Sequence, residues 1–246
     1  MNIAELLGIL DTIAPFASAE AWDNVGLLAG SEQNEVGGIL CALELDEDVL
    51  ARALALGCDT MVVHHPIMFR GRKDLRSDDA EGRLLRRLAR TDLSLVAMHT
   101  NFDRARPGVN DALAERLGLT EVRHFESGMR LGDTEESTLK DFSALVGNAL
   151  GEPVRCYGDP AKIIRSVAVM GGSGGDCIPD ALSVRADAFV TGEVGYHRAL
   201  EASWNGLAVL EAGHAATERP AAALLARLIR EKTDNIGLTI PVYNLS

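Results

Sequence analysis

The sequence predicts an α/β protein with two similar three-layer α/β/α domains, which arose by an internal duplication and have mostly parallel sheets. Short apolar runs alternate with helix-like segments along the 246-residue chain, an order typical of parallel sheets covered by helices. A histidine with a carboxylate four residues later follows an apolar run in each half, as His99–Asp103 and His214–Glu218. This repeat predicts the duplication. We expect a first domain over residues 1–125, a second over 126–246 and a metal site between them.

In the first half, apolar residues at helical spacing predict a helix over residues 3–13, with Asn2 as its N-cap. The apolar run at 37–43 then predicts a buried strand. Asp46 is expected to cap the following helix and Gly57 to end it, because glycine readily adopts the left-handed conformation found after helices.

Two more strands and two more helices are expected before the midpoint. Apolar runs at 59–63 and 93–98 predict buried strands. A helix is expected over about 80–91. Pro107 is expected to open another helix, since its fixed φ suits the first helical turn.

The second half repeats this order. The predicted strands cover residues 166–170, 187–191, 207–212 and 238–244. A glycine-rich turn, GGSGG at 171–175, follows the first of them. Helices are expected over about 177–185, after the GEVGYH segment, and from Pro220, which again suits a first helical turn.

The composition argues against a disordered protein and against a nucleic-acid binder. Hydrophobic residues make up 47% of the chain and charged residues 24%, as in ordinary globular proteins. The net charge is −12, whereas phosphate backbones attract clustered cations. The one basic cluster contains Arg70, Arg72, Lys73 and Arg76, and the acids Asp74, Asp78 and Asp79 dilute it. Nucleic acid is therefore not an expected partner.

The cysteines and the N-terminus favour a cytoplasmic protein. The four cysteines include no C-x-x-C pair, and Cys41 and Cys58 lie in apolar runs that predict buried thiols. The N-terminal segment has helical periodicity and no basic region, so we expect neither a signal peptide nor a membrane span. A reducing compartment fits these features.

Histidines gather at the ends of the predicted strands, where ligands bind to parallel sheets. His64 and His65 follow the strand at 59–63 and precede Pro66. Neutral imidazole is a common ligand of divalent metals. The alternative is one buried structural histidine and one surface histidine.

Two further pairs strengthen the metal hypothesis. His99 and Asp103 follow the strand at 93–98, although Asp103 would also suit a turn or cap. His214 and Glu218 follow the strand at 207–212, although a carboxylate also suits a helix N-terminus. Together, the clusters at three strand ends predict a two-metal centre. Glu218 is best placed to bridge two ions.

Other polar segments allow two interpretations each. Glu193 and His197 can be hydrogen-bond partners of the ligands or a general acid/base pair, or else capping and surface groups. The GGSGG segment resembles a phosphate-cradling turn but lacks the P-loop lysine, so a tight turn is the simpler interpretation. Residues 22–26, WDNVG, are expected to form an interface or a pocket wall.

Six motifs in order resemble the Nif-three-like family, whose members are also known as GTP cyclohydrolase I type 2 homologs or dinuclear-metal-centre hexamer proteins. They are WDNVGLLAG, VVHHPIMF, MHTNFD, GGSGG, DAFVTGEVGYH and GHAATE. The resemblance covers essentially the whole chain and indicates the short form, without the extra central domain. SGMRLGD at 127–133 is a looser match to a glycine-rich turn of the family.

The resemblance implies the Nif-three-like fold, two divalent metal ions per subunit and a ring-shaped homohexamer. The metal ligands that it implies are His64, His65, Asp103, His214 and Glu218, with Glu218 bridging the ions. It places His99, Glu193 and His197 around the metals as catalytic candidates. The donor types suit zinc, iron, manganese, nickel or cobalt.

Two functions follow from such a centre. The first is a metal-dependent hydrolase acting on a nucleotide or another phosphorylated small molecule, by GTP ring opening or by ester hydrolysis, since paired divalent ions activate water and stabilise anionic transition states. The second is a non-catalytic metal-binding, carrier or scaffold protein that acts through partners.

Overall fold

The computed structural model describes residues 1–245, which form two compact units. The first unit contains Met1–Gly108 and the segment from Ala221 onward, and the second contains Val109–Pro220. This division differs from the expected boundary after residue 125 for two reasons. The strand Thr120–His124 pairs within the sheet of the second unit, and the last strand returns to pair with a strand of the first unit. No helix among the described residues is long and apolar enough to span a bilayer.

The sheet of the first unit is mostly parallel, as expected. Its strand order is β1-β4-β3-β2-β11. The strands are β1 (Gly26–Ala29), β2 (Ile39–Ala42), β3 (Thr60–Val63), β4 (Ser94–Ala97) and β11 (Val242–Asn244). Only the pairing of β1 with β4 is antiparallel among these described strands.

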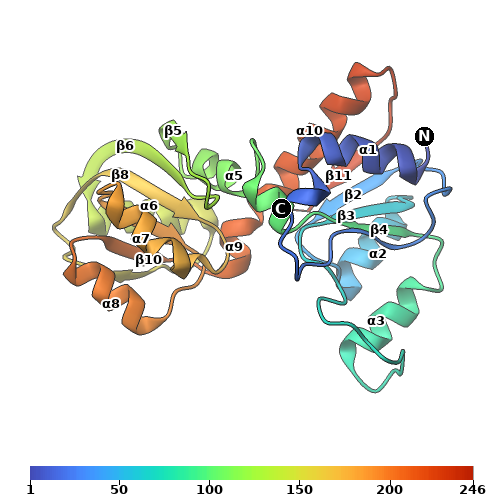
Figure 1. The fold of residues 1–246 in the computed structure, drawn as a ribbon, viewed down its shortest axis with the longest axis horizontal. Helices are drawn as coiled ribbons and strands as arrows, with labels where there is room; N and C mark the ends of the chain where they lie inside the picture. The colour runs from blue at the N-terminus through green and yellow to red at the C-terminus, as the bar shows by residue number, and fades with distance from the viewer. Residues whose placement is uncertain (246) are drawn as a thin grey trace. The chain divides into compact units, whose positions relative to one another are not determined.

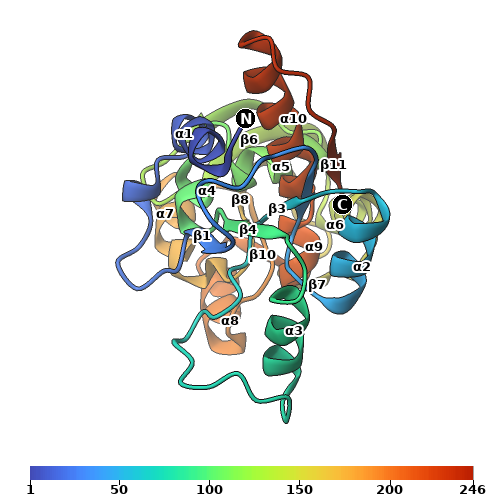
Figure 2. The same ribbon diagram turned by 90° about the vertical axis from the view of Figure 1, so that its right-hand side faces the viewer.

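Helices cover both faces of this sheet. They are α1 (Ile3–Ile13), α2 (Glu47–Ala55), α3 (Ala80–Leu88), α4 (Thr100–Arg104) and α10 (Pro220–Asn235), with a 3₁₀ turn η1 (Phe16–Ser18). Figures 1 and 2 show α1 and α10 on one face and α2 and α3 on the other. Leu50 of α2 and Leu88 of α3 pack with Leu40 and Met61 of the sheet. The first unit is therefore a three-layer α/β/α structure.

The helix caps lie where the sequence predicts them. Asn2 and Glu5 form a reciprocal capping box with two hydrogen bonds of 2.9 Å, which satisfies N–H groups of the first helical turn. Asp46 accepts a hydrogen bond of 2.7 Å from Val49 N at the start of α2. Gly57 follows α2 with a φ of 70°, a conformation that glycine adopts without a steric penalty.

The sheet of the second unit has the strand order β5-β6-β8-β9-β10-β7. Its strands are β5 (Thr120–His124), β6 (Arg130–Thr138), β7 (Arg155–Tyr157), β8 (Ile163–Met170), β9 (Ala188–Thr191) and β10 (Ala208–Glu211). The pairings β8–β9 and β9–β10 are parallel, but β5–β6, β6–β8 and β10–β7 are antiparallel. The expectation of a mostly parallel sheet is wrong here, because β6 and β7 run against the parallel core.

Alternating strand residues bury the two faces of this sheet against different helices. The helices are α5 (Val109–Arg116), α6 (Leu139–Leu150), α7 (Ile178–Ser183), α8 (Tyr196–Trp204) and α9 (His214–Glu218), with a 3₁₀ turn η2 (Gly174–Cys177). Val167 and Val190 pack with Phe142 of α6, whereas Phe189 packs with Ala199 of α8 on the other face. Period-two alternation thus makes the second unit three-layered as well.

Several local predictions need correction. The helix expected to open at Pro107 begins at Val109, after a cis peptide bond between Arg106 and Pro107. The SGMRLGD segment is not a turn throughout, since β6 starts at Arg130 and includes Gly132. The α/β class is confirmed, while the internal duplication stays a prediction.

Candidate metal centre

Three histidines of the first unit meet at the carboxyl ends of two parallel strands. His64 and His65 follow β3 directly, and His99 lies just after β4. The two strands are neighbours in parallel register, so their ends share one edge of the sheet. Each histidine offers a ring nitrogen within 4.8 Å of those of the other two, and the group could hold a metal ion. Figure 1 shows β3 and β4 side by side.

Hydrogen bonds at Nδ1 orient these rings. Nδ1 of His64 lies 2.8 Å from the carbonyl oxygen of Met98. A carbonyl only accepts, so Nδ1 carries a proton, and in the neutral ring Nε2 then carries the lone pair. Nδ1 of His65 lies 3.4 Å from a carboxylate oxygen of Glu44. Histidine ligands of metals commonly donate their second ring nitrogen in this way.

Asp103 joins the cluster through the short helix α4. Its Oδ1 lies 3.6 Å from Nε2 of His64. The helix starts directly after the β4 end, so its first turn carries a carboxylate back toward the histidines. Imidazole and carboxylate donors together fit a divalent transition metal. The structure therefore brings His64, His65, His99 and Asp103 together, and His99 stands among the possible ligands.

Asp23 is a functional candidate that sequence reasoning missed. Its side chain is fully buried and lies 2.8 Å from Nδ1 of His99. Asp23 also accepts hydrogen bonds from the backbone N and the hydroxyl of Thr100, at 3.0 and 2.5 Å. Burial raises the pKa of Asp23, but the hydrogen bonds from Thr100 and His99 outweigh it and hold the pKa below its usual value. An ionised Asp23 therefore fixes the ring of His99.

In the second unit, α9 pairs a histidine with a buried carboxylate. Nε2 of His214 lies 3.1 Å from Oε2 of Glu218, one helical turn on, and Nδ1 lies 3.4 Å from Oε2 of Glu193. The hydrogen bond to Glu218, helped by Glu193 and opposed by burial, raises the pKa of His214 to about 9. Metal binding needs the neutral ring, so it would release a proton here.

Two glycine turns leave room for this pair. A Cβ on Gly172 would lie 2.1 Å from Oε1 of Glu218 and 3.1 Å from Nε2 of His214, and the φ of Gly172 is 61°. A Cβ on Gly192 would lie 2.6 Å from the carbonyl oxygen of Gly172. Gly172 N donates to the hydroxyl of Thr217 at 3.1 Å. The GGSGG segment is thus a tight turn packed against the candidate ligands.

The two remaining candidates differ in their surroundings. The exposed Glu193 accepts a hydrogen bond of 3.2 Å from the Ser173 hydroxyl and lies beside His214. His197 is exposed on α8, and its ring packs against Tyr196 at 5.4 Å. Among the described residues, His197 belongs to none of the groups that could hold a metal ion.

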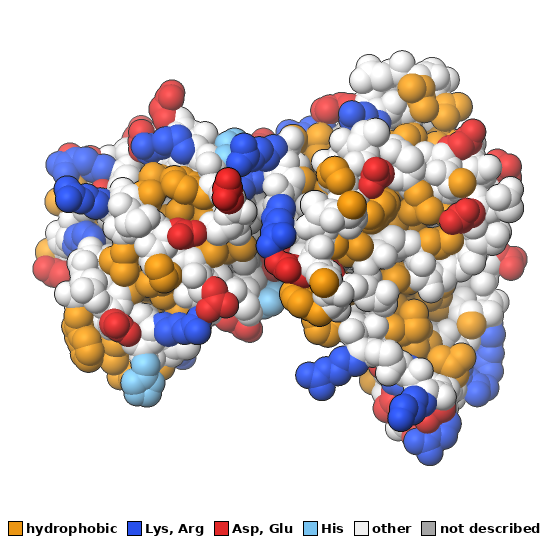
Figure 3. All heavy atoms as spheres, in the orientation of Figure 1, with side chains coloured by type: hydrophobic (Ala, Val, Ile, Leu, Met, Phe, Trp, Pro, Cys, Tyr) orange, Lys and Arg blue, Asp and Glu red, His pale blue; other side chains and the backbone are white. Residues whose placement is uncertain are grey.

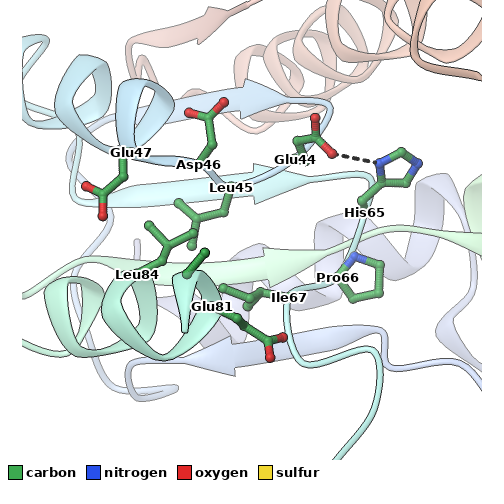
Figure 4. A pocket seen from close by; sticks show the side chains of 10 residues that line it. Glu44, Leu45, Asp46, Glu47, His65, Pro66, Ile67, Glu81 and Leu84 are labelled. Carbon is green, nitrogen blue, oxygen red and sulfur yellow. Dashed lines mark hydrogen bonds and ion pairs between the residues drawn. The ribbon is translucent and has the colours of Figure 1, made fainter. Parts of the chain in front are cut away.

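A pocket of about 390 Å³ adjoins His65 in the first unit. Leu45, Ile67 and Leu84 form apolar parts of its lining, and Glu44 links it to His65 (Figure 4). Glu81 also lines it. The pocket therefore places an apolar surface, together with the carboxylates of Glu44 and Glu81, beside His65.

Ion pairs neutralise much of the basic cluster of the sequence. Arg72 pairs with Asp79 at 2.8 Å and with Glu81 at 2.6 Å, and Arg76 pairs with Asp74 at 3.3 Å. Figure 3 shows basic and acidic side chains intermixed at the end of the first unit that carries α3. Acidic neighbours therefore offset the charge of Arg72 and Arg76 in this cluster.

Proteins of other organisms are similar in sequence to this chain over most of its length. A "GTP cyclohydrolase 1 type 2 homolog" of Clostridium perfringens is 31% identical over 245 residues, which cover 96% of this chain and 94% of the relative. A protein of Streptomyces coelicolor with the same description is 34% identical over 257 residues, which cover 98% of this chain and 90% of the relative.

Solved structures and a family model agree with these relatives. The Staphylococcus aureus hypothetical protein SA1388 has a TM-score of 0.95 at 30% identity, covering 100% of this chain and 96% of its own. A Bacillus cereus protein related to NIF3 has a TM-score of 0.94 at 23% identity, covering 100% and 97%, and shows the shared fold. The model of the Duf34/NIF3 (NGG1p interacting factor 3) family matches residues 1–246. As the six sequence motifs predict, the chain belongs to the Duf34/NIF3 family.

Proposed function

We propose that this protein is a metal-dependent hydrolase acting on a nucleotide or another phosphorylated small molecule. Its proposed ligands for two divalent ions are His64, His65, Asp103, His214 and Glu218. The observation that carries the proposal is the cluster of His64, His65 and His99, whose ring nitrogens lie within 4.8 Å of one another. The description of two relatives as GTP cyclohydrolase 1 type 2 homologs supports the choice of a nucleotide.

The donor set fits zinc, iron, manganese, nickel or cobalt. Gly172 adds a steric argument, because any side chain there would displace the Glu218 carboxylate. Bound divalent ions would supply Lewis acidity toward water and phosphoryl oxygens. The polypeptide itself would then have to bind the substrate and move protons.

Glu193 and His99 are the proposed proton-transfer groups. Glu193 is an exposed carboxylate 3.4 Å from Nδ1 of His214, so a group that can exchange protons with solvent lies beside a proposed ligand. His99 is held by Asp23 with its Nε2 turned away from that carboxylate, and it acts either as a third histidine ligand or as an acid/base group. His197 is the third proposed catalytic candidate, which rests on the family resemblance alone.

The first experiment measures metal content and hydrolysis together. Elemental analysis of the purified protein is expected to give two ions per chain, and turnover is assayed on GTP and on a panel of phosphoesters. Glu218→Gln and His64→Ala are each expected to lower turnover at least about 100-fold. His197→Ala is the matched control for metal content, because His197 lies in none of the groups of described residues that could hold a metal ion.

The same variants test whether the five ligands serve one dinuclear centre. If they do, His64→Ala and Glu218→Gln will each reduce the content of both ions. Independent sites would instead lose one ion in each variant. Activity that survives complete removal of metal by a chelator would refute the hydrolase proposal. The proposed homohexamer is checked by the native mass of the purified protein.

A metal carrier is the second candidate. Side-chain burial favours it, because His64 is 3% exposed and Glu218 is 5% exposed, as expected for ligands that retain an ion away from solvent. A carrier would transfer its metal to an apo-acceptor at a useful rate and would hydrolyse none of the phosphoesters. Turnover in the absence of any acceptor separates the two functions.

A further inference from the structure

Two exposed aromatic rings stand beside the histidine cluster of the first unit. Trp22 is 58% exposed and Phe69 is 48% exposed. They belong to distant segments but pack edge-to-face, with centroids 5.5 Å apart and an interplanar angle of 64°. Both rings also pack against His99, at 6.2 and 6.1 Å. A group resting on this pair would therefore sit next to a candidate metal ligand.

The backbone directly before Phe69 is held in an unusual conformation. Met68 precedes Phe69 and has a φ of 60°, which is unfavourable for a residue with a side chain. Its carbonyl accepts a hydrogen bond of 3.1 Å from the Asn24 amide, and its N–H donates to Glu81 at 3.1 Å. Asn24 is two residues from Trp22, so one hydrogen bond ties together both aromatic segments.

We propose that Trp22 and Phe69 form an aromatic platform, in which a planar heteroaromatic ring of the substrate stacks on one of the two rings and meets the other edge-on. The inference rests on the proposed function and names the part of the substrate that this surface recognises. Nucleobases stack readily on exposed aromatic side chains. The strained Met68 then has a role, because it fixes Phe69 against Trp22 and His99.

The size of the platform argues for a small ring rather than a second protein. At 58% and 48% exposure, the two side chains together present roughly 200 Å². A stable protein interface buries about 800 Å² on each partner. One face of a heteroaromatic ring matches the available area much better.

The chain offers a direct readout, because Trp22 and Trp204 are its only two tryptophans. Trp204→Phe leaves Trp22 as the sole indole, and Trp22→Phe leaves Trp204, which is 79% exposed on α8. Each variant, with its metal as isolated, is titrated with guanosine 5′-monophosphate. Ribose 5-phosphate serves as the matched probe without a ring.

Guanosine monophosphate is expected to quench the fluorescence of Trp22 saturably and to leave Trp204 unchanged, while ribose 5-phosphate quenches neither. In the Trp204→Phe background, Phe69→Leu keeps apolar bulk but removes the aromatic ring, and it is expected to weaken binding about 5- to 150-fold. Phe69→Tyr keeps the ring and is expected to bind within about threefold of the parent, since the flat stacking face is retained.

Three outcomes would overturn the platform: no quenching of Trp22, equal quenching by ribose 5-phosphate, or unchanged affinity in Phe69→Leu. A changed oligomer mass in Phe69→Leu would identify the rings as a subunit contact and would overturn it too. Hydrolysis without quenching contradicts the platform alone. Quenching in a protein that hydrolyses nothing contradicts the proposed function alone.

Discussion

The buried carboxylate of Asp23 lies 2.8 Å from Nδ1 of His99, although 76 positions separate the two residues in the sequence. The same carboxylate accepts two hydrogen bonds from Thr100. Asp23 therefore couples the segment before β1 to the start of α4. It gives the WDNVG motif a specific role, which is to set the orientation of a histidine ring in the candidate metal centre.

Replacing Asp23 by Asn is expected to weaken metal binding about 10- to 100-fold. The amide keeps the size of the side chain, but its NH₂ group would face either His99 Nδ1–H or the N–H of Thr100, and neither can accept. Competition with a chromogenic chelator measures the affinity. Thr100→Val removes only the hydroxyl and is expected to have a smaller effect. Wild-type affinity in Asp23→Asn, with an unchanged melting temperature, would contradict the role of Asp23.

The Gly172 turn leads to a second prediction. Gly172→Ala would put a Cβ 2.1 Å from Oε1 of Glu218 at a φ of 61°, so the carboxylate or the turn must move. We expect metal content to fall and the free energy of unfolding to drop by about 1–3 kcal/mol. Gly195→Ala is the matched control, because a Cβ there meets nothing within 4 Å and its φ is −65°. Equal metal content in both variants would show that the turn does not shape the site.

Much of this fold is visible in the sequence because its signals are local. The capping box of Asn2 and the four fully buried residues of β3 have direct sequence signatures. The histidines were also recognisable, because a parallel sheet brings its strand ends to one edge. The helix α6 also has a local signal, since its buried residues Leu139, Phe142 and Val146 recur at helical spacing.

Other features could not be predicted, for physical reasons. The strand β5 is mostly exposed, and β6 is buried only over its first three residues, so neither has the apolar run that marks a buried strand. The return of β11 to β2 depends on pairing between distant segments, which chain order does not reveal. The contact of Asp23 with His99 is likewise set by tertiary structure, and a lone aspartate carries no spacing signal.

A third prediction concerns the fully buried Arg130, which pairs with Asp111 at 2.6 Å. Arg130→Met is expected to lower the free energy of unfolding by about 3 kcal/mol, which is the lower end of the cost of breaking a buried ion pair. The lower end applies because the Asp111 side chain is 17% exposed and still has His124 as a partner at 2.7 Å. Arg123→Met is the control, since its pair with Asp133 is exposed and is worth at most about 1 kcal/mol. Urea unfolding measures both, and equal losses would contradict the importance of burial.

A fourth prediction concerns thiol reactivity. Burial raises the pKa of Cys41 to about 12 and also raises the pKa values of Cys58 and Cys177. Since the thiolate is the reactive form, these three should react slowly in the folded protein. Cys156 is exposed and is expected to react first with a disulfide reagent at pH 8. The folded wild-type protein should therefore show one fast-reacting thiol, and the Cys156→Ser variant should show none. After denaturation, all four thiols of the wild type should react. Several fast thiols would contradict this.

The pKa of Cys41 also sets a fifth expectation, a dependence of stability on alkaline pH. In the unfolded chain this thiol ionises near pH 9, whereas in the folded chain it ionises near pH 12. The unfolded state therefore binds fewer protons in this window, so stability is complete below pH 9 and falls as the pH rises. Cys41 should lower the free energy of unfolding by about 1 kcal/mol between pH 8.5 and 10. Denaturant unfolding at both pH values measures this loss. The Cys41→Ala variant should lose about 1 kcal/mol less unfolding free energy over this pH range than the wild type. The variant of the exposed cysteine, Cys156→Ala, should lose as much as the wild type. Identical losses in all three proteins would contradict the expectation.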